Sequence, residues 1–102
     1  MIRRQISNAL RELERYYPII YLGGPRQAGK TTLLKSLYPD LPYANLDDPE
    51  LRLLAEYDPR RFLKDFQRGA VLDEAQRAPQ LFSYLQVMVD ADPKLQFVLS
   101  GS

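Results

Sequence analysis

The residues best suited to chemistry lie in one glycine-rich stretch near the start of the chain. This stretch fits the pattern G-x-x-x-x-G-K-S/T and reads Gly24, Pro25, Arg26, Gln27, Ala28, Gly29, Lys30, Thr31. Glycines let a backbone curl so that successive N–H groups point inward at a phosphate. A lysine at this point brings a compact positive charge to the outer phosphates of a nucleotide, and the next hydroxyl can ligate Mg²⁺. The pattern predicts a phosphate-binding loop over residues 24–31.

The surroundings of this loop fit the same interpretation. A short apolar run over 19–22 precedes the loop and indicates a buried strand, and residues 31–37 follow it with leucines at helical spacing. A helix that begins here aims its positive N-terminal end at the same anion. From average residue frequencies, a chain of this length would match the pattern by chance less than ~1% of the time.

A second group of chemical interest follows an apolar strand expected over 70–72. Asp73 and Glu74 stand next to each other at its end. Asp73 could hold a water on Mg²⁺ opposite Thr31, and Glu74 could orient and deprotonate an attacking water. An acid after a strand is a weak signal alone, and its spacing after the phosphate loop strengthens it. The second carboxylate favours a water-attacking ATPase over a P-loop kinase, and the sequence lacks the Asn-Lys-x-Asp pattern of GTPases.

The end of the chain supplies further polar groups. Ser100, Gly101 and Ser102 follow an apolar strand expected over 95–99. If this strand lies between the first and the third, its end sits beside the γ-phosphate, where Ser100 or Ser102 could sense the phosphate. The alternative is a solvated chain end.

Composition excludes several other kinds of chemistry. The 102 residues include no Cys and no His, so a disulfide, a thiolate or imidazole zinc site and a Ser–His–Asp or Cys–His system are ruled out. Hydrophobic residues make up 45% and charged residues 26%, which favours one soluble globular domain. No apolar run reaches the length of a membrane span. We expect a cytoplasmic protein, because the lack of Cys fits a reducing compartment.

The formal net charge of +1 hides an asymmetry. Residues 1–35 carry seven basic and two acidic side chains, whereas residues 36–102 carry seven and eleven. A basic front could serve an anionic ligand, but the favoured reading is that its arginines form the solvated face of an amphipathic helix over 3–16. A nucleic-acid partner stays unsupported, because no array of stacking aromatic and basic residues accompanies this front.

Strand and helix signals alternate along the rest of the chain. A weaker strand is expected over 43–46, and Asp48-Pro49 and Asp58-Pro59 each combine an N-cap with a proline at the first helical position. Pro79 is expected to open a helix whose apolar stripe includes Phe82. Such alternation predicts an α/β fold with a mostly parallel sheet, which binds ligands at the carboxyl ends of its strands.

Four segments together resemble a known family: residues 24–34, 45–49, 72–79 and 99–102. The chain is similar there to the N-terminal AAA-type ATPase domain of a bacterial and archaeal family, whose mostly uncharacterised members add a C-terminal domain of unknown function. The resemblance implies a P-loop NTPase fold of the ASCE/AAA-like kind over residues 1–102, with three α/β/α layers and the sheet order 2-3-4-1.

The resemblance also implies roles for individual residues. ATP and Mg²⁺ are the expected cofactors, with Thr31 and Asp73 at the metal. Catalytic roles fall on Glu74, Lys30, Ser100 and Ser102. The expected nucleotide-binding residues are Gly24, Pro25, Arg26, Gln27, Ala28, Gly29, Lys30, Thr31 and Thr32.

The family continues beyond the sensor region with a fifth strand, further helices and the C-terminal domain. We therefore expect an ATPase domain that is incomplete at its C-terminus, with the first strand at the sheet edge. Expected partners are a nucleotide, the missing C-terminal domain and, as an open option, further copies of the chain. Arg77 could act in trans as an arginine finger, although a surface or capping contact is favoured. Asp47 and Asp48 are expected in capping and loop roles.

Two functions stay open. One is an Mg²⁺-dependent ATPase core that drives the unseen C-terminal part, and the other is a nucleotide-binding switch or fragment that hydrolyses ATP little or not at all.

Overall fold

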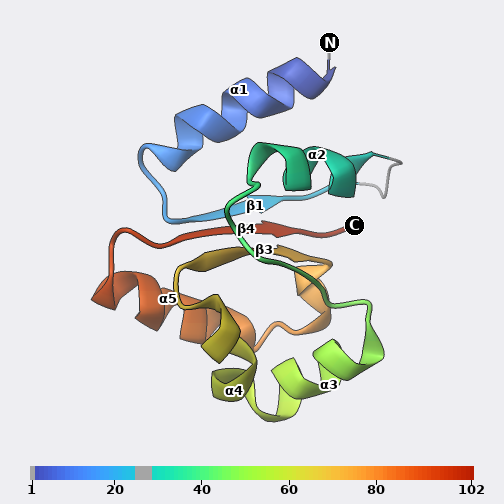
Figure 1. Ribbon diagram of the computed structural model, residues 1–102, viewed down its shortest axis with the longest axis vertical. Coiled ribbons are helices and arrows are strands. Elements are labelled where there is room, and N and C mark those ends of the chain that lie inside the picture. Colours follow the sequence, from blue (N-terminus) through green and yellow to red (C-terminus); the bar gives the residue numbers. More distant parts are fainter. Residues whose placement is uncertain (1, 25–28) are drawn as a thin grey trace.

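The protein is a parallel β-sheet with helices on both faces (Figure 1), and its computed structural model describes residues 2–24 and 29–102. The strands are β1 (Ile19–Leu22), β2 (Tyr43–Asn45), β3 (Gly69–Asp73) and β4 (Gln96–Ser100). The helices are α1 (Ile2–Glu14), α2 (Lys30–Leu37), α3 (Pro49–Tyr57), α4 (Pro59–Leu63) and α5 (Leu81–Ala91), with short 3₁₀ turns η1 (Lys64–Phe66) and η2 (Ala75–Arg77). Within the described ranges, none of these helices is long and apolar enough for a bilayer.

The strand order is β1-β4-β3-β2, and every neighbouring pair is parallel. This order agrees with the 2-3-4-1 arrangement that the family resemblance implies. β3 is buried along its whole length and β4 nearly so, because both lie in the middle of the sheet. The register pairs Leu22 with Ser100 and Asn45 with Asp73, so the carboxyl ends of all four strands meet at one edge.

Side chains that alternate along the strands build a separate core on each face of the sheet, which confirms the three-layer fold. Helices α1 and α2 cover the face that carries Val71 and Val98. Helices α3, α4 and α5 cover the other face, which carries Leu72 and Leu99. Because alternate residues share a face, Asp73 and Ser100 point to the α1–α2 side, two positions after the two valines.

Local signals explain where two of the helices begin. The Asp48 carboxylate accepts a hydrogen bond from the Glu50 amide at 2.9 Å and caps α3. The Asp58 carboxylate accepts one from the Arg61 amide at 3.2 Å and caps α4. A proline follows each cap at the first helical position. A backbone N–H there would have no partner within the helix, so the helix loses no hydrogen bond to proline.

Three expectations need correction. Pro79 does not open α5: it lies in the turn before the helix, where its carbonyl accepts a hydrogen bond from the Phe82 amide at 3.2 Å. Phe82 is 39% exposed rather than part of the buried stripe of α5, which consists of Leu81, Leu85 and Val89. The strand over 19–22 is not buried throughout, since it lies at the sheet edge and Tyr21 is 49% exposed.

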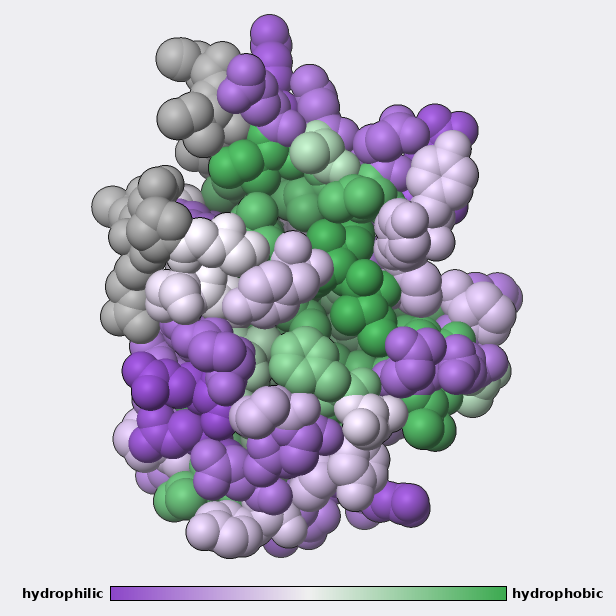
Figure 2. All heavy atoms as spheres, turned by 180° about the vertical axis from the view of Figure 1, so that it is seen from behind, coloured by the Kyte–Doolittle hydropathy of each residue, from purple (hydrophilic) through white to green (hydrophobic). Residues whose placement is uncertain are grey.

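Figure 2 shows a band of hydrophobic residues down the middle of the face seen from behind.

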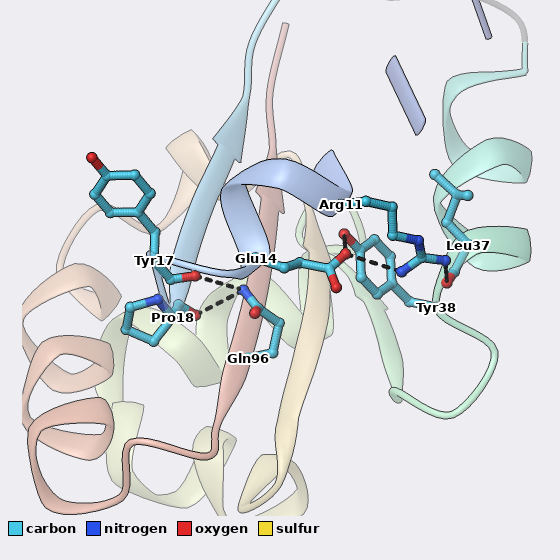
Figure 3. A network of polar contacts seen from close by, with 7 residues as sticks. All are labelled: Arg11, Glu14, Tyr17, Pro18, Leu37, Tyr38 and Gln96. Atoms are coloured by element: carbon cyan, nitrogen blue, oxygen red, sulfur yellow. Dashed lines mark hydrogen bonds and ion pairs between the residues drawn. The ribbon is translucent and has the colours of Figure 1, made fainter. Parts of the chain in front are cut away.

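A polar network fastens α1 to the C-terminal end of α2 (Figure 3). The Glu14 carboxylate accepts hydrogen bonds from the Tyr38 hydroxyl at 2.6 Å and from the Arg11 guanidinium at 3.0 Å. Arg11 also donates to the Leu37 carbonyl at 3.1 Å and lies over the Tyr38 ring. Arg4, Arg11 and Arg15 are exposed, which agrees with the favoured reading of a solvated arginine face.

A second contact in the same view holds the connection between α1 and β1. The Gln96 side-chain amide donates to the Tyr17 carbonyl at 3.3 Å and to the Pro18 carbonyl at 3.1 Å. The start of β1 is thereby fixed against β4.

The network at Tyr38 predicts an alkaline loss of stability. Burial, followed by the hydrogen bond to Glu14, raises the pKa of Tyr38 well above its ordinary 10.0. A group whose pKa is raised by folding contributes stability below its unfolded pKa, and that contribution is lost as the pH rises through the folded pKa. We expect Tyr38→Phe to lose about 1 kcal/mol of unfolding free energy at neutral pH and to decline less than the wild type between about pH 9 and 12.

Urea unfolding across this pH range measures the effect. Tyr57→Phe is the matched control, because Tyr57 is 82% exposed and should keep the wild-type slope. Equal slopes for Tyr38→Phe and the wild type would contradict the prediction.

Candidate functional site

A buried carboxylate at the end of β3 is the centre of the candidate site. Asp73 is only 2% exposed, yet four donors surround it. Its Oδ2 accepts from the Thr31 hydroxyl at 2.6 Å and from the Tyr43 hydroxyl at 2.7 Å. Its Oδ1 accepts from the Ser100 hydroxyl and from the Glu74 backbone N–H at 3.1 Å. The carboxylate therefore joins the start of α2 to β2, β3 and β4.

The hydrogen bonds decide the charge of this group. Burial alone raises the pKa of Asp73, but the bonds from Ser100, Thr31 and Tyr43 and from the following amide outweigh it and leave the pKa below its ordinary 3.8. Burial, and then the bond to Asp73, raises the pKa of Tyr43 to about 12. At neutral pH the site thus holds an ionised carboxylate beside a protonated phenol.

The predicted phosphate loop meets the sheet beside this carboxylate. Gly24 and Gly29 both have positive φ angles, 132° and 95°, which glycine adopts readily. Helix α2 follows Gly29 directly, and the Lys30 ammonium donates to the Gly101 carbonyl at 3.0 Å. Four of the predicted nucleotide-binding residues lie outside the described residues, namely Pro25, Arg26, Gln27 and Ala28.

Glu74 has an unusual backbone conformation. Its φ of 55° and ψ of 44° lie in the left-handed region, where a side chain costs energy. The conformation turns the chain sharply from β3 into η2, and the side chain stays 4% exposed. Its Oε1 accepts from the Gln76 side-chain amide at 2.7 Å and from the Ser102 hydroxyl at 2.9 Å.

The structure brings most of the predicted site residues together. Thr31, Asp73 and Ser100 share one hydrogen-bond cluster, and Glu74 with Ser102 forms the neighbouring one. Lys30 reaches the strand end between the two serines. Thr32, one position further along α2, is exposed.

The sequence did not predict that Tyr43 and Gln76 belong to the site, and it left two roles open for Arg77. Tyr43 carried no sequence signal of its own, because it shares a sheet face with Asp73 only through the register in which β2 pairs with β3. Gln76 gave no signal beyond its closeness to Glu74. Arg77 pairs with Asp47 at 3.0 Å, which is the surface contact favoured over a role in trans.

The donor set suits a hard cation. The Thr31 hydroxyl and the Asp73 carboxylate offer two oxygens 2.6 Å apart, and oxygen is the ligand that Mg²⁺ prefers. The described ranges hold no group of three or more Asp, Glu, His or Cys residues that could enclose a metal.

A strand, a glycine-bounded loop and a helix that begins with Lys-Thr, set in a parallel α/β/α sandwich, define the P-loop NTPase class of fold. Residues 16–102 match a family of AAA domains. The chain belongs to this AAA domain family, as the sequence resemblance predicts, and membership points to nucleotide binding.

Two mycobacterial proteins are similar along almost the whole chain. They are "Uncharacterized protein Mb2031c" of Mycobacterium bovis and "Uncharacterized protein Rv2008c" of Mycobacterium tuberculosis, each 37% identical over 102 residues. The alignment covers 98% of this chain and 23% of each relative, so the chain spans about a quarter of their length. No solved structure matches the chain significantly.

The site predicts a stability effect at Ser100. This residue is completely buried and donates to an ionised carboxylate, so Ser100→Ala leaves Asp73 with one fewer donor. We expect a loss of about 1.5–3 kcal/mol of unfolding free energy at pH 7 in metal-free buffer. The loss should shrink as the pH falls through the depressed pKa of Asp73, because a protonated carboxyl needs fewer donors.

Urea unfolding measures this difference, with Ser83→Ala on the exposed side of α5 as control. Equal stability of Ser100→Ala and Ser83→Ala at pH 7 would show that the buried hydroxyl contributes nothing.

Proposed function

We propose that this protein binds ATP with Mg²⁺ and hydrolyses it to ADP and phosphate. The observation that supports this most directly is the convergence of Lys30, Thr31, Asp73 and Glu74 at the carboxyl edge of the sheet, at the start of α2. Phosphoryl transfer to water needs these groups: an ammonium for the phosphates, a hydroxyl and a carboxylate for the metal ion, and a second carboxylate for the attacking water.

Binding falls to the loop over 24–31 together with Thr32. Backbone N–H groups of the loop and of the first turn of α2 would hold the phosphates, and the helix dipole favours their negative charge. The Lys30 ammonium now donates to the Gly101 carbonyl, and on nucleotide binding it would exchange this neutral acceptor for a phosphate oxygen.

Thr31 and Asp73 would hold the magnesium ion, Thr31 directly and Asp73 through a water. When bound, Mg²⁺ neutralises charge on the phosphates. The ionised state of Asp73 suits this role, since its depressed pKa keeps the negative charge at neutral pH. Tyr43 keeps its proton, because its pKa is about 12, and continues to donate to Asp73.

Glu74 would act as the general base. Its carboxylate takes a proton from water as the water oxygen forms a bond to the γ-phosphorus, and the bond from that phosphorus to the β–γ bridging oxygen breaks to leave ADP. Ser100 and Ser102 lie at the end of β4 next to the two acids, where they could sense the γ-phosphate. In the longer relatives the energy of this reaction would move a part of the protein beyond the ATPase domain, in the cytoplasm.

Lys30→Ala tests nucleotide binding. The substitution removes the ammonium group from the outer phosphates, so we expect the affinity for ATP to fall by roughly 10- to 100-fold, as for a lost charge-assisted contact. Isothermal titration calorimetry with Mg²⁺ measures it. Lys35→Ala, on the same helix but over the Tyr43 ring, is the control and should bind like the wild type. Unchanged affinity in Lys30→Ala would refute the phosphate-loop assignment.

Glu74→Gln tests hydrolysis. The amide cannot accept a proton from water, so we expect turnover to fall by about 10²–10⁴-fold while ATP still binds. Phosphate release and calorimetry on the same sample measure the two quantities. Equal turnover in the variant and the wild type would remove Glu74 from the mechanism. Protection of the wild type by ATP against thermal unfolding, with no phosphate release, would identify a nucleotide-binding switch instead.

A further inference from the structure

One oxygen of Glu74 carries two hydrogen bonds from different parts of the chain. The Gln76 amide approaches from η2 at 2.7 Å, and the Ser102 hydroxyl approaches from beyond β4 at 2.9 Å. Two donors on one carboxylate oxygen fix the direction of the side chain. The Gln76 contact is local, since only one residue separates it from Glu74, and it forms just after the left-handed turn.

The other end of the Gln76 side chain lies close to Gly101. A Cβ atom added at Gly101 would overlap the Gln76 side-chain oxygen and the Tyr21 hydroxyl, so a larger residue there would require these side chains to move. The amide nitrogen of Gln76, rather than its oxygen, faces Glu74, because the nitrogen donates hydrogen bonds and the carboxylate accepts them.

Gly101 also connects this pair to the predicted phosphate loop. Its carbonyl accepts from the Lys30 ammonium at 3.0 Å, and its N–H donates to the Leu22 carbonyl at 3.2 Å, at the end of the strand that leads into the loop. Gln76 thus donates directly to Glu74, and it also lies close to Gly101, whose carbonyl accepts from Lys30.

We propose that Gln76 is a positioning residue that holds the Glu74 carboxylate in the direction needed to take a proton from water. The proposal rests on the proposed function, because it assigns Gln76 to the base of that reaction. A primary amide suits the task, since it donates a hydrogen bond but does not titrate near neutral pH, so the proton transfer stays with Glu74.

Gln76→Leu removes the donor and keeps much of the side-chain volume. We expect kcat for ATP hydrolysis to fall by roughly 10- to 100-fold, the effect of a misplaced catalytic group, while the dissociation constant for Mg²⁺-ATP stays within about twofold. Gln76 is an exposed residue, so its loss opens no cavity in the core. The matched control is Gln86→Leu, which removes an exposed bond to Asp90 on α5 and should leave both quantities unchanged.

A double variant separates this inference from the proposed function. If Gln76 acts through Glu74, adding Gln76→Leu to Glu74→Gln lowers kcat no further. Full kcat in Gln76→Leu, with turnover abolished in Glu74→Gln, overturns the inference and leaves the proposed function intact. Turnover that survives Glu74→Gln removes Glu74 as the base and overturns the inference, whereas a wild type that releases no phosphate from ATP overturns the proposed hydrolysis. Should Gln76→Leu fail to fold, Gln76→Met removes the same donor, keeps the unbranched shape of the side chain and carries the same expectation.

A readout that needs no turnover tests the contact itself. In ¹⁵N-labelled protein, the side-chain amide signal of Gln76, assigned by its loss in Gln76→Leu, should move in Glu74→Ala, whereas the Gln86 signal should not. An unmoved Gln76 signal would show that the amide does not donate to Glu74, and would overturn the inference.

Discussion

The ionised carboxylate of Asp73 is the interaction on which the arrangement of this molecule depends. A charge that is 2% exposed must be fully hydrogen-bonded, because an unpaired buried charge costs several kcal/mol. Its partners come from the first turn of α2, from β2, from β4 and from the backbone after β3. The strand order and register must therefore bring these segments to one point, and a register shift of one residue would turn Ser100 to the opposite face.

Much of this could be predicted from the sequence, because the signals are local. The Asp-Pro pairs indicate where α3 and α4 begin, and short apolar runs that end in polar residues indicate β3 and β4. The glycine pattern likewise predicts a tight loop over 24–31, and Gly29 within it has a φ of 95° that few other residues adopt. These features need no knowledge of what lies nearby in space.

What the sequence left undetermined depends on tertiary neighbours. Tyr43 belongs to the site only because β2 pairs with β3 in one register, and Gln76 because the backbone turn at Glu74 brings its amide onto the Glu74 carboxylate. Phe82 has the spacing of a core residue but is partly exposed, since periodicity does not fix where the edge of the buried helix face falls. The sequence allowed the arginines of α1 to form either a site for an anionic ligand or the solvated face of a helix. The contacts of Arg11 with Glu14 and with the end of α2 favour the second interpretation.

The left-handed backbone at Glu74 has a thermodynamic consequence. A non-glycine residue in this region raises the energy of the folded state by about 1–3 kcal/mol, and glycine would adopt the same dihedral angles without strain. A variant with glycine at this position would be relieved of the strain and would also lack the carboxylate. At this position, a residue that lowers the backbone strain cannot also supply a carboxylate. Glu74 supplies the carboxylate, and the folded state carries the strain.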